Sequence, residues 1–160
     1  MEFSKIIKEN LMRIVIAEVN EAIKEGNSPF AAILVDEKGN IIEKAHNTAK
    51  SMCNPVLHAE INLITNACKK LNTRDLSDYC IISNAWNCSM CMSACIKAKI
   101  QNYIYGAPSE RDMNPNITIF DIREKTTTDL NIQTGILEDE CKVQIDNARR
   151  INKEYLKQGN

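Results

Sequence analysis

Three side chains that commonly bind metal ions stand in two short motifs of this sequence. Cys88 and Cys91 form a C-x-x-C pair within "SNAWNCSMCMSAC", and His58 begins an H-x-E triplet within "NPVLHAEINLI". Zinc binds thiolate and imidazole ligands, and a set of two cysteines and one histidine leaves its fourth position open for water, as in catalytic sites. The last residue of the triplet, Glu60, could then move a proton of that water.

The C-x-x-C pair alone also fits two other interpretations. It could be a thioredoxin-like redox pair, or two buried cysteines that act as small apolar side chains. A redox pair leaves His58 and Glu60 without a role, and chance does not readily produce both motifs in this order, so we rank both interpretations below a metal site. Cys95 offers a fourth thiol for a closed structural site, but on a continuing helix it lies a turn beyond Cys91 and is expected to face the core.

Length and composition indicate an ordinary globular chain. The 160 residues fit a single domain, residues 1–160, and the proportions of 44% hydrophobic and 26% charged residues are typical of folded proteins. No apolar run is long enough to cross a bilayer and the N-terminus lacks a signal-peptide pattern, so we expect a cytoplasmic protein without a membrane partner. Seven cysteines, an odd number, argue against a disulfide framework. A net charge of −1 gives little support to nucleic-acid binding, although it does not exclude a local basic patch.

Helical and strand patterns alternate along the chain. Residues 3–25 predict an amphipathic helix, and "FAAILVDEKGNIIEKAHN" predicts two antiparallel strands joined at residues 37–40. A second helix is expected to start at Asn54 as its N-cap. The buried face of that helix is expected to carry five residues, namely Leu57, Ile61, Ile64, Cys68 and Leu71.

The second half of the chain continues the same alternation. Strands are expected at 79–83, 102–107 and 129–134, and a charged amphipathic helix at 136–157. Asn87 is expected to cap the helix that carries the cysteine pair. The order predicts a three-layer α/β domain with a mixed sheet. His58 and Cys88 both fall at helix starts, where free N–H groups lower the pKa of a nearby thiol.

Together, "NPVLHAEINLI" and "CSMC" resemble the zinc-dependent cytidine deaminase superfamily, whose pattern is H-x-E followed by P-C-x-x-C. The resemblance covers most of the chain and is strongest to the branch of guanine deaminases, yeast-type cytosine deaminases and tRNA adenosine deaminases. It implies an α/β/α cytidine-deaminase-like fold with a mixed five-stranded sheet, and a homodimer. It also implies one Zn²⁺ ion per chain held by His58, Cys88 and Cys91, with Glu60 as the catalytic proton shuttle.

The resemblance further implies four residues that contact the substrate. They are Phe30, Asn47, Ala59 and Trp86. Asn47 matches an asparagine that contacts the base or sugar in relatives. Trp86 and Asn87 stand where relatives commonly have Glu-Pro, and the tryptophan could stack on a base, narrow the pocket or pack in the core. His46 is interpreted as a structural residue.

Different features of the sequence favour different substrates. Pro29-Phe30 resembles guanine deaminases, and "YGAPSERD" lacks the Arg-Asp that bacterial tRNA enzymes often carry directly after Gly-Ala. "TGILEDEC" resembles the tRNA enzymes instead, and the last helix carries basic residues, namely Arg149, Arg150, Lys153 and Lys157.

We therefore predict an enzyme, a hydrolase that releases ammonia from an aminated nucleobase or nucleoside, guanine-like first, with RNA not favoured. The alternatives are a tRNA adenosine-to-inosine deaminase and a zinc-bound, non-catalytic relative that serves as a binding module.

Overall fold

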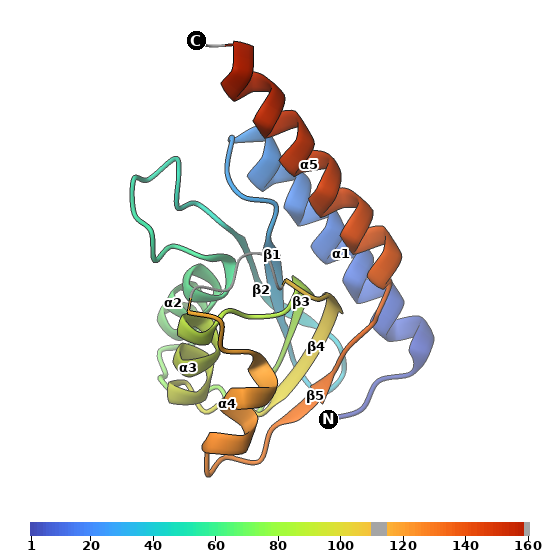
Figure 1. Cartoon of the computed structure of the whole chain (residues 1–160). Coiled ribbons are helices and arrows are strands. Elements are labelled where there is room, and N and C mark those ends of the chain that lie inside the picture. Colours follow the sequence, from blue (N-terminus) through green and yellow to red (C-terminus); the bar gives the residue numbers. More distant parts are fainter. Residues whose placement is uncertain (110–114, 159–160) are drawn as a thin grey trace.

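A mixed five-stranded sheet lies between two layers of helices in the computed structural model, which describes residues 1–109 and 115–158 (Figure 1). The strands follow the order β2-β1-β3-β4-β5. β1 pairs antiparallel with β2 and β3, and β3, β4 and β5 run parallel. Their bounds are β1 (Ala31–Val35), β2 (Ile41–His46), β3 (Cys80–Ala85), β4 (Asn102–Ala107) and β5 (Asn131–Gln133). The predicted three-layer α/β fold is confirmed.

The helices divide between the two faces of the sheet. α1 (Lys5–Lys24) and α5 (Glu138–Gln158) lie side by side on one face (Figure 1). On the other face lie α2 (Ala59–Leu71), α3 (Ser89–Lys97) and α4 (Ile119–Lys125). Because both faces are covered, β1 is buried throughout, with Leu34 in the core under α2 and Ile33 in the core under α1. None of the described helices is long and apolar enough to cross a membrane.

The start of α2 differs from the sequence prediction. Its N-cap is His58, not Asn54. The side chain of Asn54 instead accepts a hydrogen bond from the N–H of Val56 at 3.2 Å, so it stabilises a turn before the helix. Four residues of α2 are buried, namely Ala59, Glu60, Leu63 and Ala67, whereas the predicted stripe is only partly buried. The small side chains at two of these positions let the helix lie close to the sheet, which moves the buried face away from the bulky residues.

The start of the helix that carries the cysteine pair differs from the prediction as well, by one residue. Cys88 is the N-cap of α3, and Asn87 is not. Asn87 is buried and its Nδ2 donates to the Sγ of Cys95 at 3.5 Å. An amide that is turned into the core cannot reach the free N–H groups of the helix start, which explains the difference.

The sequence prediction missed α4 altogether. Thr118 is its N-cap, and Thr118 and Asp121 form a capping box in which each side chain bonds to the other's backbone. A threonine followed three residues later by an aspartate is a recognised helix-start signal, and it could have identified this short helix. The other helices and strands lie within two residues of their predicted bounds.

Candidate metal centre and active site

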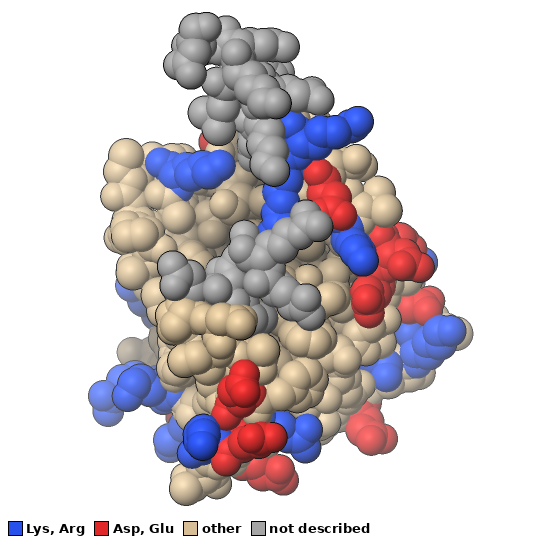
Figure 2. All heavy atoms as spheres, viewed as in Figure 1, with Lys and Arg blue, Asp and Glu red and all other residues tan. Residues whose placement is uncertain are grey.

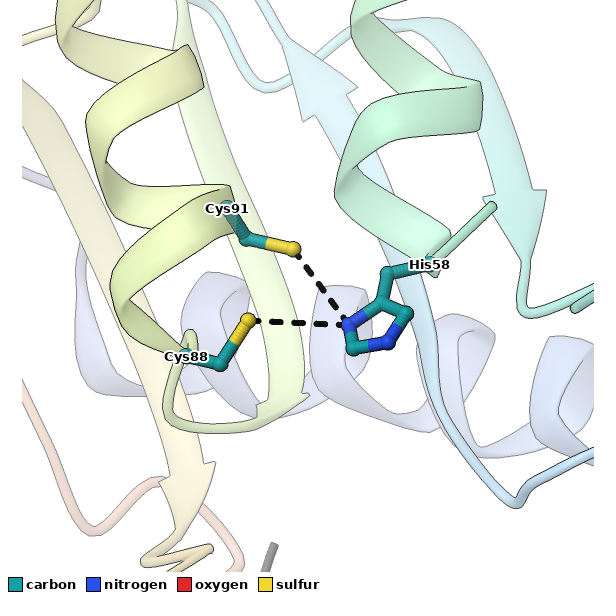
Figure 3. A group of neighbouring side chains, drawn as sticks. All are labelled: His58, Cys88 and Cys91. Carbon is teal, nitrogen blue, oxygen red and sulfur yellow. Dashed lines mark hydrogen bonds between the residues drawn. The ribbon is translucent and has the colours of Figure 1, made fainter. Parts of the chain in front are cut away.

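His58, Cys88 and Cys91 meet where the N-terminal ends of α2 and α3 approach each other (Figure 3). The Nδ1 atom of His58 lies 3.6 Å from the Sγ of Cys88 and 3.6 Å from the Sγ of Cys91. The ligand atoms of all three lie within 4.8 Å of one another. A nitrogen at about 2.0–2.1 Å and a sulfur at about 2.3 Å from one tetrahedral zinc ion would lie about 3.6 Å apart, so this set fits zinc.

Two helix N-termini favour negative charge at this site. His58 and Cys88 are both N-caps, and neither makes a side-chain capping bond. Free N–H groups at a helix start stabilise a thiolate. The hydrogen bond from Cys91 lowers the pKa of Cys88 to about 4 against the effect of burial, and His58 adds to this shift. The same pairing, together with burial, raises the pKa of Cys91. The pair therefore presents one thiolate beside the imidazole.

A cavity of about 240 Å³ opens next to these residues. Among the described residues, its lining comprises Ser28, Phe30, Asn47, His58, Glu60, Ala85, Trp86, Cys88 and Ser109. Glu60 is only 6% exposed, and burial raises the pKa of its carboxyl. A carboxyl group whose pKa is shifted toward neutrality can both take up and release a proton, as an acid-base catalyst must.

Three of the four predicted substrate-contacting residues line this cavity, namely Phe30, Asn47 and Trp86. The Oδ1 of Asn47 accepts the N–H of Ala49 at 3.1 Å, which fixes the amide and leaves its nitrogen as a donor for a bound base. Ala59 is the first residue of α2, is fully buried, and is not among the described lining residues. Its contact with the substrate stays a prediction.

Trp86 belongs both to the cavity wall and to the packing around α4. Its ring meets the ring of Phe120 edge to face, with centroids 5.3 Å apart at 87°. The hydroxyl of Ser109 donates to the backbone oxygen of Trp86 at 2.6 Å. Among the described residues, the indole Nε1 is buried without a hydrogen-bond partner. The unpredicted helix α4 therefore fixes the orientation of the tryptophan.

Sequence reasoning also missed Asn84, which holds a segment of the cavity wall in place. This fully buried residue of β3 accepts the N–H of Ala31 at 3.0 Å through Oδ1 and donates from Nδ2 to the backbone oxygen of Pro29 at 3.0 Å. It thus holds the chain on both sides of Phe30. A lone asparagine at a buried position of the apolar strand "CIISNA" is the signal that could have identified it.

The fold and the Cys₂His set define a zinc-dependent hydrolase of the deaminase type. The zinc-binding region of cytidine and deoxycytidylate deaminases matches residues 5–107. A tRNA-specific adenosine deaminase of Aquifex aeolicus is 32% identical over 120 residues, which make up 75% of this chain and 78% of that protein. One from Bacillus subtilis is 29% identical over 135 residues, 83% of each chain. The chain belongs to the cytidine and deoxycytidylate deaminase family, whose members hydrolyse C–N bonds.

Solved structures of deaminases share the fold. A tRNA:A34 deaminase superposes with a TM-score of 0.76 at 23% identity, covering 84% of this chain and 98% of that one. The guanine deaminase from Nitrosomonas europaea gives a TM-score of 0.78 at 22% identity, covering 88% and 83%. At this level of identity the likeness establishes the α/β/α architecture and not the substrate.

Proposed function

We propose that this protein hydrolyses the exocyclic amino group of an adenosine presented in RNA, forming inosine and ammonia. The observation that carries the proposal is the position of Glu60, whose buried carboxyl lines the same cavity as His58 and Cys88. The sequence alone ranked a guanine-like substrate first and tRNA adenosine second. The tRNA adenosine deaminases among the curated relatives give the second reading the better support.

In the proposed mechanism, His58, Cys88 and Cys91 would hold one zinc ion and Glu60 would move the protons. Zinc in an open site of this kind supplies an activated water nucleophile at neutral pH. Glu60 would take a proton from the attacking water as its oxygen bonds to C6 of the base, and would deliver that proton to the ring nitrogen N1. It would then carry the proton of the new C6 hydroxyl group to the amino group, so that the C–N bond breaks, the C6 carbonyl forms and ammonia leaves. One water is consumed and one carbonyl is formed.

The walls of the cavity suit a flat heterocycle. Phe30 and Trp86 offer aromatic surfaces on which a base can stack. The amide nitrogen of Asn47 can donate a hydrogen bond to a ring nitrogen or a sugar oxygen. The hydroxyl of Ser109 lies on the same wall, where it is held by the backbone of Trp86.

A second hollow next to the cavity supports a substrate that carries phosphate. It measures about 180 Å³ and shares Ser109 with the cavity, and two basic residues, Lys142 and Arg149 of α5, line it together with Asp146. The Cζ of Arg149 lies 6.0 Å from the centre of the Phe30 ring, so this residue reaches the edge of the base cavity. Among the described residues that line this hollow, two cations stand against one carboxylate, a balance that favours an anion.

Charge is mixed over the rest of this face of the molecule. Figure 2 shows Lys and Arg interspersed with Asp and Glu along α5, without a uniformly basic surface. RNA binding would therefore depend on a few local contacts near the cavity rather than on a broad field. Residues 110–114, which include the Glu-Arg-Asp of "YGAPSERD", and the side chains of Lys153 and Lys157 lie outside the described residues.

The test is ammonia release by the zinc-loaded protein from adenosine, guanine, cytosine and an RNA hairpin with adenosine at the wobble position. We expect turnover of the hairpin, and its loss in Glu60→Gln with the zinc content unchanged. Glu124→Gln, the same change on the exposed side of α4, is the matched control and should behave as wild type. Turnover of guanine alone would contradict this proposal and would support the guanine-like substrate instead. Zinc binding with no turnover of any substrate would favour the non-catalytic binding module.

A further inference from the structure

His46, at the end of β2, lies between two carboxylates, those of Glu18 in α1 and of Glu25, the C-cap residue of that helix. Its Nδ1 is 2.7 Å from the Oε1 of Glu18, and its Nε2 is 3.1 Å from the Oε2 of Glu25. A neutral imidazole has one N–H only, and an ionised carboxylate has no proton to donate. Both contacts can be hydrogen bonds at the same time only when each ring nitrogen carries a proton, so the geometry selects the charged form of His46.

Within the group formed by Glu18, Glu25, Lys44 and His46, the charges balance only in that form, because Glu21 pairs separately with Lys24. Lys44 of the same strand lies 2.8 Å from the other oxygen of Glu18, and Glu21 acts on Lys44 from a greater distance. Burial opposes the charge on His46, but its bonds to Glu18 and Glu25 outweigh burial and raise its pKa. Burial likewise opposes the charge on Glu18, whose bonds to Lys44 and His46 keep its pKa low. Loss of the His46 proton would leave one excess negative charge in this half-buried cluster.

The backbone of His46 leads directly into the wall of the cavity. The N–H of the next residue, Asn47, donates to the backbone oxygen of Phe30 at 2.9 Å, and both residues line the cavity. The carbonyl of His46 accepts a hydrogen bond at 2.9 Å from Asn62 of α2, the helix that carries Glu60. The imidazole therefore anchors α1 to the point where β1, β2 and α2 meet around the cavity.

Glu25 extends the same connection to the loop beyond Asn47. Its Oε2 also accepts a hydrogen bond from the Nδ2 of Asn27 at 3.2 Å. The Oδ1 of Asn27 in turn accepts the backbone N–H groups of Lys50 at 3.2 Å and Ser51 at 3.0 Å. One carboxylate thus holds the imidazole and, through one asparagine, the segment that follows the cavity wall.

We propose that His46 in its protonated form positions the wall of the substrate pocket. By bridging the two carboxylates it keeps Asn47 and Phe30 in place, and loss of its proton loosens this wall and weakens substrate binding. Because the interactions raise the pKa of the folded protein's His46, they are fully present below its ordinary value and disappear as the pH rises through the raised value. The proposal rests on the proposed function only for the choice of assay substrate.

The first measurement needs no catalysis. The chain has two histidines, so comparison of labelled wild type with His46→Gln assigns the His46 signal in an NMR titration. We expect His46 to titrate above pH 6.5, and the side-chain amide signal of Asn47 to shift with the same midpoint in the wild type but not in the variant. A His46 that titrates at or below pH 6.5, or an Asn47 signal that does not follow it, would overturn the proposal.

The second measurement is KM and kcat for the RNA hairpin as a function of pH. KM should rise roughly fivefold, the equivalent of about one hydrogen bond, as His46 loses its proton, while kcat is unaffected by this step. His46→Gln should show the high KM at every pH. Glu25→Gln, at a half-exposed position, should shift the step to lower pH without loss of the fold.

Glu43→Gln is the matched control, because Glu43 lies on the same strand but pairs with Lys70 of α2 at 3.3 Å. It should keep the wild-type pH profile. Wild-type KM values in His46→Gln, or a parallel loss of kcat and zinc in both His46→Gln and Glu25→Gln, would contradict a positioning role. If the wild type turns over none of the substrates, the proposed function fails while the NMR titration still decides the role of His46.

Discussion

Replacement of Gly106 by alanine should destabilise the protein by an amount that the structure allows us to work out. A Cβ at this position of β4 would lie 2.5 Å from the Sγ of Cys141 and 2.7 Å from the backbone oxygen of Asn84. Non-bonded heavy atoms normally lie about 3.5–4.0 Å apart, and overpacking of a core costs about 1–3 kcal/mol. The second contact is with the backbone of a central strand that cannot move aside. We therefore expect the upper end of this range, roughly 3 kcal/mol.

Thermal unfolding measures this cost directly. For a chain of this length, about 3 kcal/mol corresponds to a decrease in Tm of roughly 6–12 °C. Because Asn84 also holds the chain around Phe30, we expect KM to rise as well. Cys141→Ala removes the sulfur at 2.5 Å, so the Gly106→Ala/Cys141→Ala double variant should be more stable than the sum of the single changes predicts, by more than about 0.5 kcal/mol.

A glycine without close neighbours provides the control. Gly26 has a positive φ of 77° and nothing within 4 Å of its Cβ position, so alanine there introduces backbone strain but no overlap. The loss of stability in Gly26→Ala should be the same with and without the Cys141→Ala change. A Tm for Gly106→Ala within about 1 °C of the wild type, or strict additivity with Cys141→Ala, would refute the packing argument.

Four further predictions concern the site and the oligomeric state. Phe120→Ala removes the edge-to-face support of Trp86, the single tryptophan, so KM should increase several-fold with little change in kcat, and substrate should quench its fluorescence less. Chelation of zinc should abolish activity and lower the Tm, and Cys88→Ser should fail to rebind the metal in an elemental assay. Lys142→Ala and Arg149→Ala should each reduce kcat/KM for the RNA hairpin and the salt dependence of kcat/KM, with the zinc content unchanged. Light scattering should give twice the 18.1 kDa of one chain if the expected homodimer forms.

Local spacing explains which parts of the site the sequence alone could predict. Cys88 and Cys91 are three residues apart on one helical turn, so they face the same side. Glu60 lies in the first turn of the helix that His58 caps, so the chain itself keeps these two residues near each other. The alternation of helices and strands likewise predicted the three layers, because it reports which faces are buried. The exact helix starts were not predictable in this way, since Asn54 and Asn87 have the right chemistry for caps but bond elsewhere.

The sequence by itself therefore determined the class of chemistry, through ligand types at fixed local spacing. Only the tertiary structure decided which side chains lie around the proposed active site. α4 places Phe120 against Trp86, and α1 with its C-cap residue places two carboxylates on either side of His46, across 28 and 21 residues of sequence. These contacts join segments that are distant in the chain, so no local periodicity encodes them. They form only when the helices of the two layers pack against the sheet.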